Sequence, residues 1–134
     1  MKKLLILLAS LGCSSYTLTT PTEEALTGKW NLTAVNGTSL PYTVPQIGPK
    51  QEVIEDVLTI ATSKTFTEVT TIRITQNGQV TTKTVTDTGT YEFNSYAVTF
   101  HFQTDGSFGS GTLTGRTMTI TASGVSFTYR KQEK

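Results

Sequence analysis

The sequence is poor in cysteine, histidine and net charge. Cysteine and histidine each occur once, as Cys13 and His101, and the formal net charge is +1. A single cysteine excludes an intramolecular disulfide, so stability has to come from core packing. A single histidine, on the polar face of a predicted strand, excludes a catalytic triad or a histidine-rich metal site. Because a nearly neutral chain lacks a basic surface for phosphates, we predict no nucleic-acid partner. We also predict no metal and no cofactor.

The N-terminal apolar segment is too short to be a permanent membrane anchor. It covers residues 4–11 and as a helix would rise about 12 Å, against a hydrocarbon core of roughly 30 Å. Met1, Lys2 and Lys3 give the segment a positively charged start, which is the layout of a secretory signal. We therefore predict that residues 1–12 are a signal peptide.

The end of this segment, Ser10-Leu11-Gly12-Cys13, resembles the lipobox of bacterial lipoproteins. Gly12 and Cys13 fit the pattern, whereas Ser10 and Leu11 stand in the reverse of the usual order. The resemblance implies cleavage before Cys13 and lipidation of its thiol, which would hold the protein on the bacterial cell envelope. Ser14 is not the aspartate that retains such lipoproteins in the inner membrane, so the outer membrane is favoured. The alternative is an unmodified cysteine in a leader that is cleaved elsewhere.

A polar tether and a single domain are predicted to follow. Residues 13–26 comprise the lipidated cysteine and a threonine-rich stretch with Pro21, a composition typical of a linker. Roughly a fifth of all residues are threonine, and valine, isoleucine, phenylalanine and tyrosine supply much of the apolar remainder, which favours β-strands. Residues 27–132 are enough for one domain with a real core.

Alternating apolar and polar residues predict the fold of this domain. Turn residues such as Asn77-Gly78 and Asp105-Gly106 interrupt the alternation at short intervals, so consecutive strands should pair as hairpins. With no helix to cover the apolar face, we predict an all-β, up-and-down antiparallel β-barrel of about eight strands, with a sandwich as the competing fold. The predicted strands cover residues 29–35, 53–61, 65–75, 79–86, 90–94, 96–103, 110–114, 116–122 and 125–131.

One face of each strand is predicted to point into the barrel. Tyr96, Val98, Phe100 and Phe102 share such a face, and His101 lies on the other. The same pattern holds for Leu58 with Ile60, Ile72 with Ile74, Tyr91 with Phe93, Met118 with Ile120, and Phe127 with Tyr129.

Both ends of the predicted domain resemble lipocalins. Gly28-Lys29-Trp30 is similar to their Gly-x-Trp signature, and residues 127–130, Phe-Thr-Tyr-Arg, are similar to their closing segment. Asn36-Gly37, Leu40-Pro41, Gly89-Thr90-Tyr91 and Gly111-Thr112-Leu113-Thr114-Gly115 resemble the bacterial lipocalin-like domain. The resemblance implies that Arg130 lies across the ring of Trp30 at the closed end of the barrel, as a cation–π pair. It also implies small hydrophobic ligands as a class.

The long loop at residues 36–52 resembles the lipocalin loop that covers the barrel mouth. Pro41, Pro45 and Pro49 stiffen it, and Tyr42, Val44 and Ile47 are candidate lid residues, unless the loop is an ordinary surface loop. A barrel of this size is either filled by its side chains or holds one small ligand, and the sequence leaves both open. The candidate ligand-lining residues are Phe66, Tyr91, Phe93, Tyr96, Phe100, Phe102, Phe127 and Tyr129.

The sequence offers little that predicts catalysis. Asp87-Thr88-Gly89 matches the aspartic-protease triplet but occurs once, at an expected turn. Glu55 and Asp56 are neighbours on opposite faces of a strand and form no facing carboxylate pair. We therefore expect a monomeric, lipid-anchored envelope protein without enzyme activity that binds a small hydrophobic molecule. The alternatives are a periplasmic protease inhibitor of similar small-barrel fold and a structural or adhesive surface module.

Overall fold

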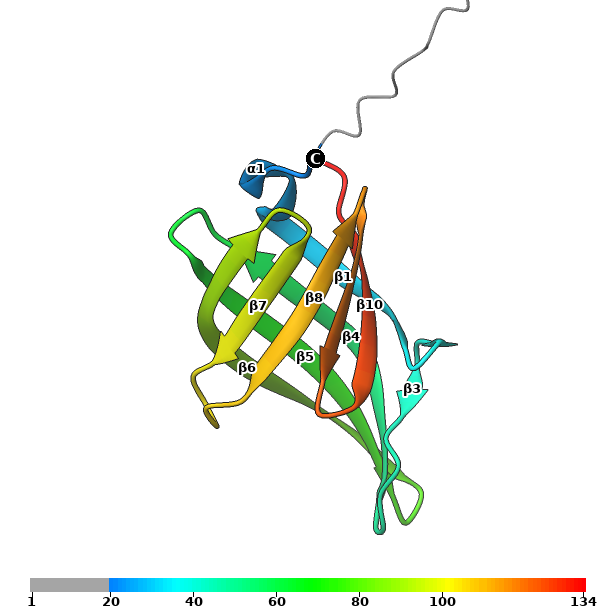
Figure 1. Cartoon of the computed structure of the whole chain (residues 1–134). Coiled ribbons are helices and arrows are strands. Elements are labelled where there is room, and N and C mark those ends of the chain that lie inside the picture. Colours follow the sequence, from blue (N-terminus) through cyan, green and yellow to red (C-terminus); the bar gives the residue numbers. More distant parts are fainter. Residues whose placement is uncertain (1–19) are drawn as a thin grey trace, which may run out of the picture.

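A computed structural model describes residues 20–134 of the chain, and Cys13 with the predicted signal peptide lies outside the described residues. One short helix, α1 (Glu23–Leu26), precedes the strands (Figure 1). The strands are β1 (Gly28–Val35), β2 (Thr38–Ser39), β3 (Tyr42–Thr43), β4 (Lys50–Ile60), β5 (Thr65–Gln76), β6 (Gln79–Asn94), β7 (Ala97–Phe102), β8 (Phe108–Thr114), β9 (Thr117–Ala122) and β10 (Val125–Lys131).

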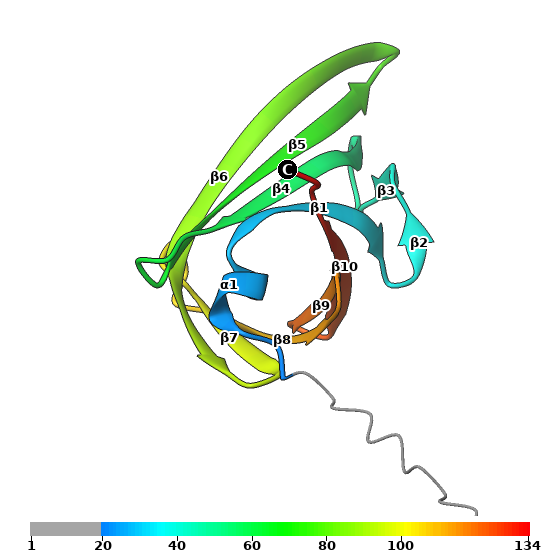
Figure 2. The same ribbon diagram turned by 90° about the horizontal axis from the view of Figure 1, so that it is seen from above.

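The eight longer strands form a closed antiparallel barrel. Strands β4 to β10 pair in sequence order, β10 pairs with β1, and β1 pairs with β4 to close the ring. The two-residue strands β2 and β3 extend the outer edges of β1 and β4. The view along the barrel axis shows one continuous ring, so the predicted barrel is confirmed and the two-layer sandwich is excluded (Figure 2).

The main error in the predicted strands concerns the Asp87-Thr88-Gly89 triplet. Two strands were predicted around a turn at these residues, but they lie inside the single long strand β6. Gly89 suits this position because the neighbouring strands lie too close to leave room for a side chain. A Cβ atom on it would lie 2.0 Å from the His101 carbonyl oxygen and 2.7 Å from the Phe66 ring.

The α1 end of the barrel is filled by side chains. Trp30 is completely buried, and its indole Nε1 donates a hydrogen bond of 2.8 Å to the carbonyl oxygen of Leu26. Phe66 packs edge-on against Phe100, with ring centroids 5.3 Å apart. Helix α1 lies across this opening in the axial view (Figure 2). The fully buried side chains of the core are Trp30, Tyr91, Tyr129, Phe66, Phe100, Leu26, Leu58, Ile60, Leu113, Met118, Val35 and Val98.

The predicted polar tether ends earlier than residue 26. Thr22 caps α1 by accepting a hydrogen bond from the Ala25 backbone N–H, and Leu26 is completely buried in the barrel core. Burial of the apolar Leu26 side chain stabilises the fold relative to its exposure to water. The last residues of the predicted tether therefore belong to the folded domain.

The cation beside Trp30 is Lys131, and the prediction of Arg130 was wrong. Tyr129 points into the barrel, so strand alternation directs Arg130 outward and Lys131 inward. Trp30 is the direct register partner of Lys131, whose Nζ lies 5.7 Å from the centroid of the Trp30 ring. The same ammonium donates a hydrogen bond of 2.7 Å to the carbonyl oxygen of Ala25, which joins α1 to the last strand.

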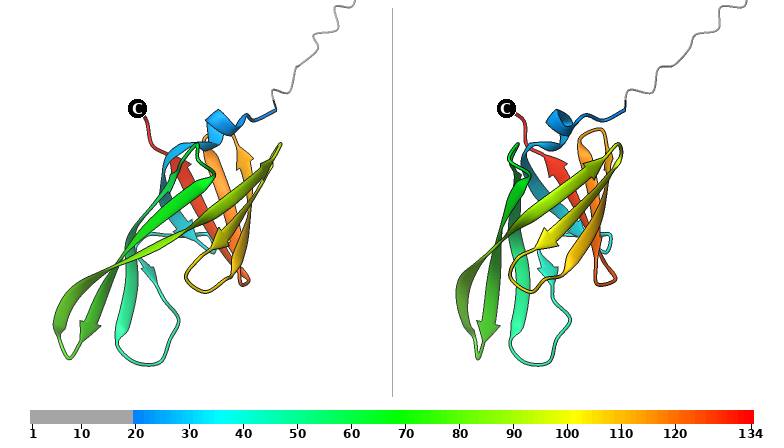
Figure 3. Two further views of the ribbon diagram at one scale, coloured as in Figure 1. Left: turned by 90° about the vertical axis from the view of Figure 1, so that its left-hand side faces the viewer. Right: turned by 60° about the vertical axis from the view of Figure 1, so that its left-hand side comes forward.

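The hairpin of β5 and β6 projects beyond the opposite end of the barrel (Figure 3). Ile72 and Ile74, predicted to face the core, lie on this projection and are only half-buried. On the neighbouring strand β4, Glu52 forms ion pairs with Arg73 of the projection and with Lys50, both at 2.9 Å. The hydrogen bonds from Arg73 and Lys50 lower the pKa of Glu52 to about 2.

Replacing Lys131 should therefore matter more than replacing Arg130. We expect Lys131→Met to lower the free energy of unfolding by about 1 to 2 kcal/mol, since it removes a cation–π contact and a hydrogen bond. Arg130→Met is the matched control and should change stability by less than about 0.5 kcal/mol, because its side chain is exposed. Urea unfolding of both variants checks this. Equal losses would contradict the assignment of Lys131.

Candidate functional site

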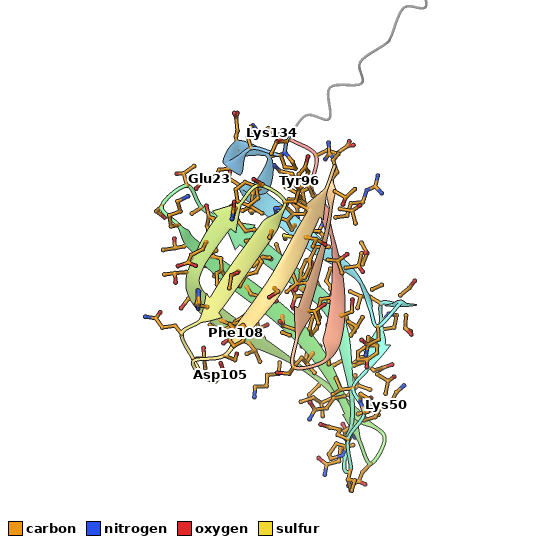
Figure 4. All side chains as sticks on the ribbon, in the orientation of Figure 1. Glu23, Lys50, Tyr96, Asp105, Phe108 and Lys134 are labelled. Carbon is orange, nitrogen blue, oxygen red and sulfur yellow. The ribbon has the colours of Figure 1, made fainter. Side chains whose placement is uncertain are left out.

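The barrel contains a cavity at the end remote from α1. Its volume is about 580 Å³. Asp105, in the turn between β7 and β8 beside the cavity, lies well below Glu23 of α1 in the view of Figure 4. The lining residues are Leu32, Val35, Tyr42, Val44, Pro45, Val53, Asp56, Glu68, Thr70, Val85, Asp87, Phe102, Thr104, Asp105, Ser107, Ile120, Ala122, Val125, Phe127 and Tyr129.

The walls of this cavity are mainly apolar. They combine aliphatic side chains such as Val53 and Val125 with the aromatic rings of Phe102 and Phe127. These residues come from β4, β7 and β10 and point inward because they occupy the same alternating face as the core. The interior is therefore divided: side chains fill the half near α1, and the half near the mouth is open.

Three of the eight candidate ligand-lining residues line the cavity, namely Phe102, Phe127 and Tyr129. Phe66, Tyr91 and Phe100 are buried in the core near α1, and Phe93 packs against that core. Tyr96 is 47 % exposed because it lies in the turn between β6 and β7, outside the strand on which it was predicted. His101 is exposed on the outer face, as predicted.

The candidate lid residues separate into two groups. Tyr42 and Val44 line the cavity, whereas Ile47 is completely exposed at the loop tip. Tyr42 pairs with Val53 of β4, and the Val44 backbone N–H donates to the Gln51 carbonyl oxygen at 2.9 Å. These hydrogen bonds attach residues 42–44 to β4, so these residues form a fixed part of the cavity wall.

Acidic and hydroxyl side chains meet at one place in the cavity. Asp56 on β4 is 5 % exposed, and its Oδ2 accepts a hydrogen bond of 2.7 Å from the Thr70 hydroxyl. The Tyr129 hydroxyl lies 2.7 Å from Glu68 Oε1 and 3.2 Å from Asp56 Oδ1. Asp87 is the direct register partner of Glu68 on the neighbouring strand and also lines the cavity. We call Asp56 and Glu68 the acidic pair.

Burial makes the acidic pair harder to ionise. Desolvation, followed by the negative charge of Asp56, raises the pKa of Glu68 to about 7. Desolvation also raises the pKa of Asp56, against the hydrogen bonds from Thr70 and Tyr129 that favour its charged form. Two carboxyl groups that interact this closely titrate as a unit.

Sequence analysis missed the acidic pair because it compared Asp56 only with Glu55. Glu55 is exposed and Asp56 is buried, so the two lie on opposite faces of the strand as predicted, and the actual partner of Asp56 lies on the next strand. A signal was present: Asp56 is two residues from the inward Leu58, and Glu68 is two residues from the inward Phe66. Carboxyl groups on the apolar face of two neighbouring strands are the pattern that identifies them.

The described part of the chain, residues 20–134, contains no group of three histidine, cysteine, aspartate or glutamate residues arranged to hold a metal ion. Within the same residues, no helix has the length and apolar character needed to cross a lipid bilayer. No known protein-family model matches the sequence, and neither does any curated protein.

Removing the carboxyl group of Glu68 should change how stability depends on pH. Because its pKa is raised from 4.5 to about 7 on folding, the folded protein binds more protons than the unfolded chain between these values. Glu68 should therefore make the free energy of unfolding fall by about 3 kcal/mol as pH rises from 4.5 to 7, and Glu68→Gln should remove this contribution and leave that of Asp56. Chemical unfolding across this pH range measures it.

The matched control for this titration is Glu55→Gln, which changes an exposed carboxyl group next to Asp56 in sequence. Its pH profile should follow that of the wild type. Parallel profiles for the wild type and Glu68→Gln would show that Glu68 is not a buried acid.

Proposed function

We propose that the protein binds a small amphipathic molecule in the cavity at the barrel mouth. The observation that carries this proposal is an apolar-walled cavity of about 580 Å³ beside a few polar groups. Small-molecule sites are mostly concave, apolar and roughly 300 to 1,000 Å³ in volume, with a small number of polar groups that fix orientation. The resemblance of Gly28-Lys29-Trp30 to lipocalins supports the same proposal, because that family binds small hydrophobic ligands.

We also propose that lipidation of Cys13 anchors the barrel to the bacterial cell envelope. The support is the charged and apolar start of the sequence and the lipobox-like residues that precede Cys13. Residue 20 leads into α1 at the filled end of the barrel (Figure 1). An anchor attached there would leave the cavity mouth facing away from the membrane, accessible to a dissolved ligand.

Filling the cavity should weaken ligand binding. The uncharged fluorescent probe N-phenyl-1-naphthylamine should bind the wild type, and Ala122→Trp should weaken its binding by about tenfold or more, because the new ring occupies the cavity. The matched control is Ala97→Trp, since Ala97 is exposed on the barrel exterior. Fluorescence titration measures affinity, and circular dichroism checks the fold. Equal probe binding by both variants would refute the cavity as the binding site.

Removing the lipidation site should release the protein from membranes. We expect Cys13→Ala to move the protein from the membrane fraction of a bacterial host to the soluble fraction, because it removes the acylated thiol. Ser15→Ala, two residues further on, serves as the control and should stay with the membranes. Immunoblotting of the two fractions provides the measurement, and unchanged partitioning of Cys13→Ala would rule out the anchor.

A further inference from the structure

Among the described residues, the acidic pair has no cationic partner, in contrast to Glu52 and Glu23. Glu52 is held by Arg73 and Lys50, and Glu23 is held by Lys64. Asp56 and Glu68 are hydrogen-bonded to hydroxyl groups, from Thr70 and Tyr129. Buried charge without a counterion costs stability, and such groups are concentrated at functional sites.

The hydroxyl groups of Thr70 and Tyr129 cannot supply as many hydrogen bonds as the acidic pair can accept. Tyr129 lies within hydrogen-bond distance of both carboxyl groups but has one hydroxyl hydrogen, which it can donate to one of them at a time. Thr70 supplies one more hydrogen, to Asp56. The two carboxyl groups together have about eight lone-pair positions. Both line the cavity, so unfilled positions are accessible from it.

The charge of the cavity wall has one sign. Asp56, Glu68, Asp87 and Asp105 line it, and the lining contains no lysine, arginine or histidine. A molecule with a negative charge would therefore be repelled, whereas a cation would be attracted and would replace the missing counterion. The apolar side chains around the acids, such as Val53 and Phe127, would contact an apolar remainder of the same molecule.

We propose that the ligand of this cavity is an amphipathic amine whose ammonium group binds the acidic pair while its apolar part contacts the cavity walls. This inference rests on the proposed function and specifies its ligand class. An ammonium group carries three N–H donors, which suits carboxyl groups that have open acceptor positions. Three or more acidic, histidine or cysteine ligands for a metal ion do not converge here in the described residues, which favours an organic cation.

Three probes of equal chain length test the charge preference. Octylamine, 1-octanol and octanoate each contain eight carbon atoms and differ in the head group, so their dissociation constants report mainly the contribution of charge. Isothermal titration calorimetry at pH 7.5 on the full chain should give octylamine about tenfold or more tighter than 1-octanol, with octanoate weakest. Equal or tighter binding of 1-octanol by the wild type would overturn the proposal.

Variants assign the preference to the acidic pair. In the double variant Asp56→Asn/Glu68→Gln, octylamine and 1-octanol should bind within about twofold of each other, because the two carboxyl groups that bind the ammonium are then neutral amides. Glu55→Gln is the matched control and should keep the preference for the amine. An amine preference that persists in the double variant would overturn the proposal.

N-phenyl-1-naphthylamine distinguishes the two levels of failure. Its neutral, apolar body tests the cavity alone. If it binds and octylamine has no advantage over 1-octanol, the amine proposal is wrong and the cavity remains a binding site. If neither the probe nor any octyl compound binds, the proposed function itself is wrong.

Discussion

Pairing of β1 with β4 is the constraint on which the rest of the structure depends. It joins the first long strand to the fourth strand of the chain and turns a sheet with one apolar face into a ring with an interior. Trp30 pairs with Leu58 in this seam, and both side chains enter the core. The same strand pairing that closes the barrel therefore also places the large ring that fills one of its ends.

The half of the interior that is not filled by core side chains contains the cavity and the acidic pair. Leu26 and Trp30 occupy the half next to α1, so the remaining cavity lies among the ends of the strands at the mouth. Asp56 and Glu68 occupy inward positions where most neighbours are apolar, and burial keeps their pKa values raised. Buried carboxyl groups without a counterion contribute little to stability, and it is this feature on which the proposed ligand class rests.

Alternation was sufficient to predict the barrel because apolar faces on consecutive strands have few ways to be buried without helices. It was also sufficient to place Phe102, Phe127 and Tyr129 inward. The Arg130 prediction was wrong because it followed the lipocalin resemblance and not alternation. With Tyr129 inward, alternation alone places Arg130 outward and Lys131 inward, and the pairing of Lys131 with Trp30 agrees with this.

Other parts of the site depend on contacts between residues distant in sequence. Gly89 was interpreted as a turn residue, although its small size accommodates Phe66 and the His101 carbonyl group on neighbouring strands. The acidic pair joins β4 to β5, and its hydroxyl donor Tyr129 comes from β10 on the far side of the closing seam. Local sequence patterns do not show which residues of distant strands come into contact. They show only, one strand at a time, whether a carboxylate points into the barrel.

Methyl NMR with N-phenyl-1-naphthylamine tests most directly whether the interior is divided into a filled half and a binding half. We predict that the methyl resonances of Val53, Val85 and Val125, which line the cavity, shift on titration with the probe. Those of Leu58, Ile60 and Met118, in the filled half, should stay in place. Shifts centred on the second group, or on neither, would contradict the account.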